Sequence, residues 1–243
     1  MNKFIPLLIL LTIFFQCAER KKSNSNSSLL GGLLLLQNSS PCPGVASATA
    51  IGSVSRTEYS FTSCNSGTVT GFTSENISAS SGITGTTANS RLASIATFGT
   101  EKVNIEVTFT LNSSGGYLDV IGLGLSSSAS ISGPGYRVSE SGIKYFSVGG
   151  TPTAIATGVT PSTALNTQKT YCLELHKENG AHLFGWSKAC AEVTNRASYE
   201  FDQESITTST PGNNIGFVLS GSTLKKIIVS TGAIGTSGSL VSQ

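Results

Sequence analysis

Charged and chemically reactive side chains are scarce in this chain of 243 residues. Only 12% of the residues are charged, there are two histidines, and tryptophan and methionine each occur once. From Cys42 onward, eleven Lys and Arg residues stand against twelve Asp and Glu residues, a net charge of −1. Because no basic stripe is present to neutralise phosphates, we expect no nucleic-acid partner.

The sequence also lacks the usual motifs of catalytic and metal sites. It contains no C-x-x-C pair and no G-x-S-x-G nucleophile elbow. His176 and His182 would need further ligands to hold a metal, and Glu178 is the obvious one nearby. We interpret both histidines as exposed hairpin residues, and we predict no metal, no cofactor and no catalytic residue.

The amino terminus has the organisation of an export signal. A charged start, Met1 to Lys3, precedes an apolar run from Phe4 to Phe15, and Cys17 follows Gln16. This arrangement resembles the signal peptide of bacterial lipoproteins, in the looser form of spirochaetes, and the resemblance implies acylation of Cys17. An uncleaved anchor is an alternative, but the run is well short of the roughly 20 residues of a spanning helix. An ordinary secretory signal is another, but no A-x-A site lies nearby.

The residues after the signal peptide predict a tether and then one folded domain. We expect residues 1–16 to be the signal peptide, 17–41 a lipidated tether and 42–243 an all-β domain. The tether contains a polar stretch, Ser23 to Ser28, and an apolar patch of unassigned role, Leu29 to Leu36. The basic cluster Arg20 to Lys22 suits anionic lipid headgroups or a solubilising linker. The lipid places the protein in the cell envelope, at the outer membrane or the cell surface rather than at the inner membrane.

Hydrophobic residues alternate with polar ones through most of the domain. Val103 to Leu111 has a period of two, which predicts a strand with one buried and one solvated face. After the turn residues 112–116, Tyr117 to Leu125 predicts a second strand. We expect tight hairpins at Ser141-Gly142 and at Ser220 to Ser222. Many strands separated by Gly, Ser and Pro turns indicate an antiparallel β-sandwich or barrel.

Four cysteines remain once Cys17 is assigned to the lipid, and an even number in an oxidising compartment indicates disulfides. Four cysteines allow three pairings. If Cys172 faces Cys190 across a hairpin, Glu174 faces Lys188 and His176 faces Trp186. The opposite face then carries four apolar residues suited to the core: Leu173, Leu175, Ala189 and Ala191. A two-residue turn at Asn179-Gly180 would give a different register, but we favour the first, and Cys42 then pairs with Cys64 by elimination.

The order of strand patterns over residues 103–231 resembles a concanavalin-like or laminin-G-like jelly roll. The resemblance rests on the alternating strand 103–111, on 171–175 turning back through 183–186, and on 215–219 with 226–229. It implies an antiparallel sandwich of a kind that commonly binds sugars or matrix proteins, and it supplies no site residues. The Glu-x-Asp-x-x-Glu strand of related glycosidases and the Asp/Asn-rich calcium loops of lectins are absent.

Two groups of side chains are candidates for a functional site. Of the two aspartates after Cys42, Asp119 and Asp202, the second alternates with Glu200 and Glu204, which could bind a cation or supply an acid and a base. A solvated strand edge is the simpler interpretation. The expected hairpin register also places three aromatic residues away from the core, where they could contact a ligand or be covered by a loop: His176, Phe184 and Trp186.

These observations predict a lipid-anchored, non-enzymatic binding module of the envelope. Its specific form would be an adhesin for host matrix, plasma protein or glycan, which rests on location, fold class and missing catalytic groups. A carbohydrate-active enzyme is the first alternative and requires Glu200, Asp202 and Glu204 to meet in a cleft. A structural envelope protein without a soluble ligand is the second.

Overall fold

The folded region that the structure describes begins at residue 41. The computed structural model describes residues 41–65, 68–98, 102–125, 133–147, 149–155, 157–158, 161–177, 180–206, 214–234 and 240–242. The predicted signal peptide, Cys17 and the predicted tether up to residue 40 lie outside this set and stay predictions. Among the described residues, none of the helices has the length and apolar character needed to cross a bilayer.

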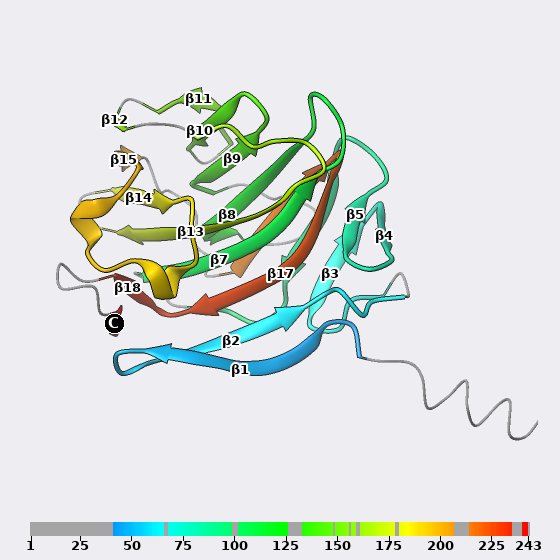
Figure 1. Cartoon of the computed structure of the whole chain (residues 1–243), viewed down its shortest axis with the longest axis horizontal. Coiled ribbons are helices and arrows are strands. Elements are labelled where there is room, and N and C mark those ends of the chain that lie inside the picture. The colour runs from blue at the N-terminus through cyan, green and yellow to red at the C-terminus, as the bar shows by residue number, and fades with distance from the viewer. Residues whose placement is uncertain are drawn as a thin grey trace, which may run out of the picture. The chain divides into compact units, whose positions relative to one another are not determined.

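The first layer is a ten-stranded sheet whose paired strands are antiparallel (Figure 1). β5 (Ile83–Gly85) also pairs with β17, and β4 (Ile77–Ala79) pairs with β5. In spatial order the main path contains β1 (Gly44–Ile51), β2 (Val54–Ser60), β17 (Ser222–Ser230), β7 (Lys102–Leu111), β13 (Gln168–Lys177), β14 (Ala181–Trp186), β15 (Phe201–Ile206) and β12 (Thr157–Gly158).

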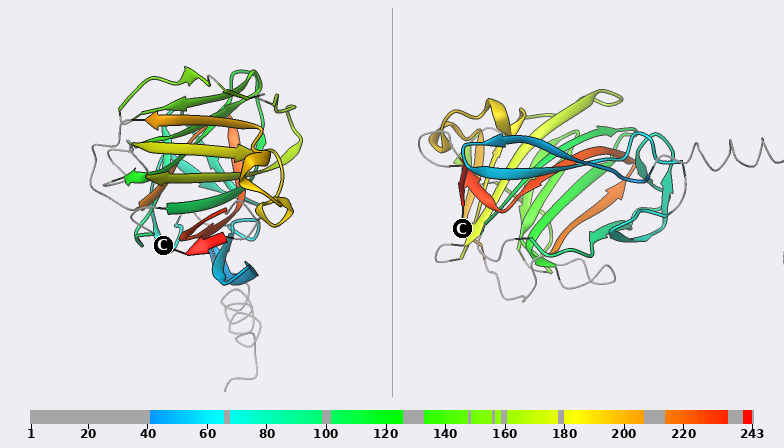
Figure 2. Two further views of the ribbon diagram at one scale, coloured as in Figure 1. Left: turned by 90° about the vertical axis from the view of Figure 1, so that its left-hand side faces the viewer. Right: turned by 90° about the horizontal axis from the view of Figure 1, so that it is seen from below.

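The second layer is a seven-stranded antiparallel sheet packed against the first (Figure 2). A separate two-stranded ribbon joins β18 (Gly232–Ile234) to β19 (Leu240–Ser242). Two 3₁₀ turns, η1 (Cys190–Glu192) and η2 (Arg196–Ser198), lie between β14 and β15. In spatial order the second sheet contains β11 (Thr153–Ala154), β10 (Gly142–Phe146), β9 (Gly135–Ser139), β8 (Tyr117–Leu125), β16 (Asn214–Ser220), β6 (Ser90–Ser94) and β3 (Phe72–Glu75).

The core lies between the two sheets and is filled by alternate residues of their strands. The odd-numbered residues of β7, from Val103 to Leu111, are buried there with Leu173 and Leu175 of β13 and Phe217 of β16. Burying apolar surface between two sheets is the main stabilising contribution in this architecture. The expected all-β antiparallel sandwich is therefore confirmed.

The second face of β7 is not solvated as the sequence pattern predicted. Asn104, Glu106 and Thr108 point away from the core, yet they are at most 6% exposed. The chain segment 187–200, which carries η1 and η2, packs beside Asn104 and Glu106: the backbone N–H of Cys190 donates to Glu106 at 2.9 Å, and Cys190 Sγ lies 3.0 Å from Asn104 Oδ1. Polar residues on the outer side of a strand therefore mark a third layer here, not solvent.

Two connections that resemble hairpins in the sequence cross between the sheets instead. β16 lies in the seven-stranded sheet and β17 in the ten-stranded sheet, so the turn at Ser220 to Ser222 joins the two layers. The expected hairpin between them is therefore wrong. This crossing packs against the one between β7 and β8, where Asn112 N–H donates to the Gly221 carbonyl at 2.8 Å. Gly221 has φ +53°, and a Cβ there would come within 2.1 Å of Ser113 Oγ, so the crossing needs glycine.

The other expected tight hairpin is present with a shifted turn. β9 and β10 pair with Ser139 opposite Gly142, so Glu140 and Ser141 form the two-residue turn. Gly142 has φ +121° and begins the returning strand. The sequence located this hairpin to within one residue, which is the usual error of an element boundary.

Both predicted disulfides are present: Cys42 with Cys64 and Cys172 with Cys190. The hairpin register used to predict the second bond is wrong. Cys172 pairs with Trp186 and Glu174 with Phe184, so Lys188 is not opposite Glu174. Strand β14 ends at Trp186, and the chain then leaves the sheet and returns over it, which brings Cys190 in η1 above Cys172. Leu173 and Leu175 face the core as expected, whereas Ala189 and Ala191 do not.

Candidate functional site

The three aromatic residues proposed from the sequence lie on one face, as expected. His176 and Phe184 stack with ring centroids 5.4 Å apart, and Trp186 joins the cluster formed by Val54, Val193 and the Cys172–Cys190 bond. Trp186 is 0% exposed, His176 3% and Phe184 7%. The expected pairing of His176 with Trp186 is wrong, because His176 pairs with His182. A covered cluster of this kind presents almost no surface to a ligand.

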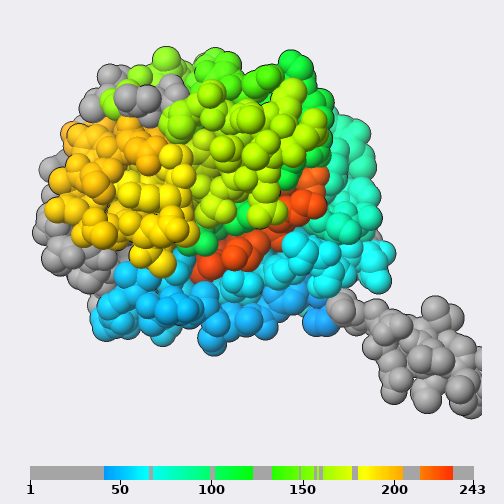
Figure 3. Space-filling model, in the orientation of Figure 1, coloured from blue at the N-terminus to red at the C-terminus, as the bar shows by residue number. Residues whose placement is uncertain are grey.

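The cover over this cluster is the segment 187–200, which lies on the outer face of the ten-stranded sheet. Figure 3 shows this side of the molecule, with the segment in yellow and orange. Besides the disulfide and the Glu106 contact, Glu200 accepts hydrogen bonds from the Ser187 backbone N–H, at 3.2 Å, and from the Ser187 hydroxyl. Tyr199 packs on Phe184 with ring centroids 5.5 Å apart. The face is therefore sealed by covalent, polar and apolar contacts together.

A fully buried carboxylate lies under this cover. Glu174 is 0% exposed, and its Oε1 lies 3.0 Å from Arg196 of η2 and 3.0 Å from Nδ1 of His176. A charge can be buried in this way only when paired groups compensate for its lost hydration. Glu174 therefore holds the cover in place.

The acidic residues Glu200, Asp202 and Glu204 do not act as one group. Glu200 is occupied by Ser187, and Asp202 is 5% exposed beside Phe184 on β15. Glu204 is exposed. Among the residues described, no three His, Cys, Asp or Glu side chains are placed to hold a metal ion. Of the three, Glu204 fits the simpler interpretation of a solvated strand edge, whereas Asp202 is buried and Glu200 is bonded to Ser187.

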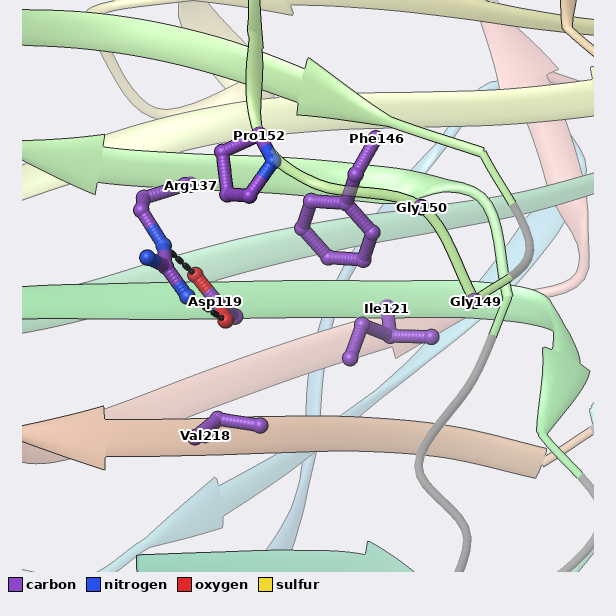
Figure 4. A pocket seen from close by; sticks show the side chains of 8 residues that line it. All are labelled: Asp119, Ile121, Arg137, Phe146, Gly149, Gly150, Pro152 and Val218. Atoms are coloured by element: carbon purple, nitrogen blue, oxygen red, sulfur yellow. Dashed lines mark hydrogen bonds and ion pairs between the residues drawn. The ribbon is translucent and has the colours of Figure 1, made fainter. Parts of the chain in front are cut away.

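An open site lies on the other side of the molecule, on the outer face of the seven-stranded sheet. Here a hollow with a volume of about 110 Å³ is formed by strands β8, β9, β10 and β16 and by the loop after β10 (Figure 4). We call it the Asp119 hollow. It is lined by Asp119, Ile121, Arg137, Phe146, Gly149, Gly150, Pro152 and Val218.

The polar centre of the hollow is a two-pronged ion pair. Asp119 pairs with Arg137 across β8 and β9, and the guanidinium donates from Nε and Nη2 to the two carboxylate oxygens, each at 2.7 Å (Figure 4). The Asp119 side chain is 7% exposed and that of Arg137 is 27% exposed. Such fork-shaped pairs are shorter and stronger than ordinary hydrogen bonds and fix both side chains.

Burial and pairing act in opposite directions on these two groups. Burial raises the pKa of Asp119 above its ordinary value of 3.8, and the hydrogen bond and charge of Arg137 offset only part of this rise. Burial lowers the pKa of Arg137, but the interactions with Asp119 and, to a lesser extent, Tyr117 outweigh it and leave that pKa raised. Asp119 is therefore the member of the pair that takes up a proton on acidification, and it does so at a higher pH than an ordinary aspartate.

Aromatic rings flank the ion pair on the same face. The Arg137 guanidinium carbon lies 3.6 Å from the centroid of the Tyr117 ring, a cation–π contact. The Tyr117 hydroxyl donates to the Ala88 carbonyl at 2.7 Å, which fixes the ring. On the far side of the hollow, Phe146 and Ile121 add apolar surface (Figure 4). A charged pair between apolar walls is typical of small-ligand sites, in which a few polar groups orient the ligand.

Sequence reasoning did not identify this site, although a signal was present. Asp119 interrupts the apolar strand Tyr117–Leu125, and Arg137 sits between Tyr136 and Val138 in β9. A carboxylate and a guanidinium on successive strands are each unremarkable. They become a site only through the β8–β9 register, which cannot be deduced from the sequence pattern of either strand alone.

The comparisons with known proteins show similarity of structure only. No family model and no curated protein matches the chain. Among solved structures, the carbohydrate recognition domain of Emp46p aligns at 11% identity and TM-score 0.45, over 68% of this chain and 90% of that one. The carbohydrate binding module CBM66 from Bacillus subtilis aligns at 16% identity and TM-score 0.39, over 66% and 92%. The Trypanosoma rangeli sialidase aligns at 10% identity and TM-score 0.43, over 80% and 31%. Likenesses this distant carry no information about function.

Proposed function

We propose that this protein is a lipid-anchored, non-enzymatic module that binds glycans in the Asp119 hollow. The observation that carries the proposal is the Asp119–Arg137 pair, which is held rigidly beside an open hollow with apolar walls. The aromatic cluster on the outer face of the other sheet is covered by the segment 187–200.

Sugar rings combine hydroxyl groups, which donate and accept hydrogen bonds, with apolar C–H faces. Each Asp119 oxygen accepts one hydrogen bond from Arg137 and retains a further lone pair for a ligand hydroxyl. Phe146 and Ile121, which are 7% and 1% exposed, form the apolar lining of the hollow beside this pair. Because the carboxylate and guanidinium are already positioned, little side-chain entropy is lost on binding.

The location of the module is supported by the sequence alone. A lipid on Cys17 would hold the domain at the envelope, at the outer membrane or the cell surface, through a tether that ends near residue 41. Mass spectrometry of the amino-terminal peptide from native membranes should show acyl chains on Cys17. An unmodified Cys17 peptide, or a mature start well downstream, would contradict the anchor.

Glycan binding is tested with the full-length chain in detergent on an array of glycans. Asp119→Asn keeps the shape of the side chain but removes its charge, and we expect binding to weaken about 10-fold or more. The matched control is Glu58→Gln, which removes one partner of the Glu58–Lys226 pair, 3.5 Å apart, on the ten-stranded sheet.

The control should bind as the unmodified chain does, and both variants should melt within a few degrees of it. Equal binding by Asp119→Asn would contradict the proposed site. Binding to no glycan on the array would contradict the proposed function and favour a structural envelope protein.

A further inference from the structure

The Asp119 hollow lies within a line of charged side chains that crosses the seven-stranded sheet. The pairing register aligns Glu75 with Arg91, Arg91 with Val218, Val218 with Asp119, and Asp119 with Arg137. Arg137 in turn aligns with Lys144. Residues directly opposite each other in antiparallel strands project from the same face. The five charged members form what we call the charged row: Glu75, Arg91, Asp119, Arg137 and Lys144.

The charged row has an excess of positive charge. It carries three cations and two carboxylates, whereas the domain from Cys42 onward carries a net charge of −1. Both carboxylates are already engaged with arginines of the row: Asp119 with Arg137 at 2.7 Å and Glu75 with Arg91 at 3.7 Å. Lys144, next to Arg137, is exposed. The surplus charge therefore lies beside the hollow.

The Arg137 guanidinium has a second edge besides the one that faces Asp119. Asp119 accepts from Nε and Nη2, and the Tyr117 side chain also interacts with the guanidinium. The Nη1–Nη2 edge is the other fork of a guanidinium and matches the two oxygens of a carboxylate or sulfate. Because Tyr117 packs on the guanidinium at 3.6 Å, this edge is fixed in direction.

We propose that the ligand is an acidic glycan, with carboxylate or sulfate groups that contact Arg137 and Lys144. This inference rests on the proposed glycan-binding function and narrows it to a substrate class. The strands are spaced about 4.8 Å apart, so Arg137 and Lys144 are one step apart, and Arg91 lies about 14 Å from Arg137 on the other side of the hollow. That span accommodates several sugar residues, with acidic groups at more than one position along the chain.

The test uses matched pairs of acidic and neutral hexasaccharides with the full-length chain. The acidic probes are hyaluronan, chondroitin sulfate and heparin fragments, and each neutral counterpart is the same fragment after carboxyl reduction and desulfation. At least one acidic fragment should bind about 10-fold tighter than its neutral counterpart, and this preference should shrink as salt is added.

Lys144→Gln with Arg91→Gln should weaken binding of the acidic fragment roughly 5- to 10-fold and leave binding of neutral glycans unchanged. The control, Lys169→Gln with Lys226→Gln, removes two charges from the ten-stranded sheet. It should leave the binding of the acidic fragment and the binding of neutral glycans unchanged.

Three results would overturn the inference. Equal affinity within all three pairs, with neutral glycans still bound through Asp119, would reject the acidic class and keep the proposed function. An equal loss in the control variant would show a response to overall charge and not to the charged row. Absence of binding to any glycan, acidic or neutral, would reject the proposed function as well.

Discussion

The outer faces of the two sheets contain similar groups in opposite situations. On the ten-stranded sheet, Glu174 pairs with Arg196 and His176, and all of this is covered by the segment 187–200. On the seven-stranded sheet, Asp119 pairs with Arg137 beside a hollow that residues 149–152 border on one side. A buried acid–base pair therefore identifies a site only where the chain leaves access to it. The same chemistry stabilises the fold on one face and is available to a ligand on the other.

The largest expected effect concerns the sealed face. Trp186→Ala should lower the free energy of unfolding by about 3–5 kcal/mol, because a fully buried large side chain leaves a cavity. Trp186→Phe should cost much less, since the indole N–H has no hydrogen-bond partner among the described residues and only part of the volume is lost. Urea denaturation measures both. Near-zero changes for both variants would mean that Trp186 is exposed and the cover is not in place.

The disulfides allow the cover to be separated from the rest of the fold. Cys172→Ser with Cys190→Ser should cost about 2–4 kcal/mol, since the bond closes a separation of 18 residues. It should also loosen the segment 187–200, so that acrylamide quenches the fluorescence of Trp186, the single tryptophan, more strongly.

Cys42→Ser with Cys64→Ser is the matched control for this experiment. The bond that this double variant removes closes a separation of 22 residues at the start of the domain, so its loss should cost a similar free energy of unfolding. Trp186, however, should stay protected from acrylamide in the folded state. Equal quenching in the two double variants would contradict the role of Cys190 in fastening the cover.

Arginine substitutions compare the two faces directly. Arg196→Gln leaves the fully buried Glu174 with one partner fewer and should cost about 1–3 kcal/mol. Arg91→Gln removes a surface pair that is 31% and 49% exposed and should change stability by less than about 1 kcal/mol. Thermal unfolding of both variants measures the difference. A larger cost for Arg91→Gln would reverse the assignment of sealed and open faces.

Acidification should affect binding on the open face with little effect on the fold. Because burial raises the pKa of Asp119, its carboxyl takes up a proton at a higher pH than an ordinary aspartate, and the ion pair is then lost. A pKa that is higher in the folded than in the unfolded state favours proton uptake by the folded state, so this group does not promote acid unfolding. Glycan binding should therefore fall before the melting temperature does. Parallel titrations of both quantities check this order.

Local patterns in the sequence were sufficient for part of this structure. The alternation in Val103–Leu111 predicted strand β7, and the even number of cysteines indicated two disulfides. The pairing of the cysteines was predicted correctly, but from a hairpin register that the structure does not have. These features depend on neighbouring residues or on a simple count, which a sequence displays directly.

Features that depend on distant contacts could not be obtained in the same way. Phe201 of β15 packs against Gly185, where a Cβ would lie 1.9 Å from its ring, and the chain between them loops out over the sheet. That detour shifts Cys190 out of the hairpin, so the register deduced from the cysteines was wrong. The Asp119 hollow likewise requires four strands that meet only in the folded sheet.

The central claim is that glycan binds on the outer face of the seven-stranded sheet and not on that of the ten-stranded sheet. Hydrogen–deuterium exchange of the full-length chain, with and without the glycan that binds tightest on the array, tests this most directly. We expect added protection in β8 (Tyr117–Leu125), in β9 (Gly135–Ser139) and in residues 149–152, with none in the segment 187–200. Protection from exchange that is confined to the segment 187–200 would contradict this claim. It would indicate that the glycan binds at the face of His176, Phe184 and Trp186.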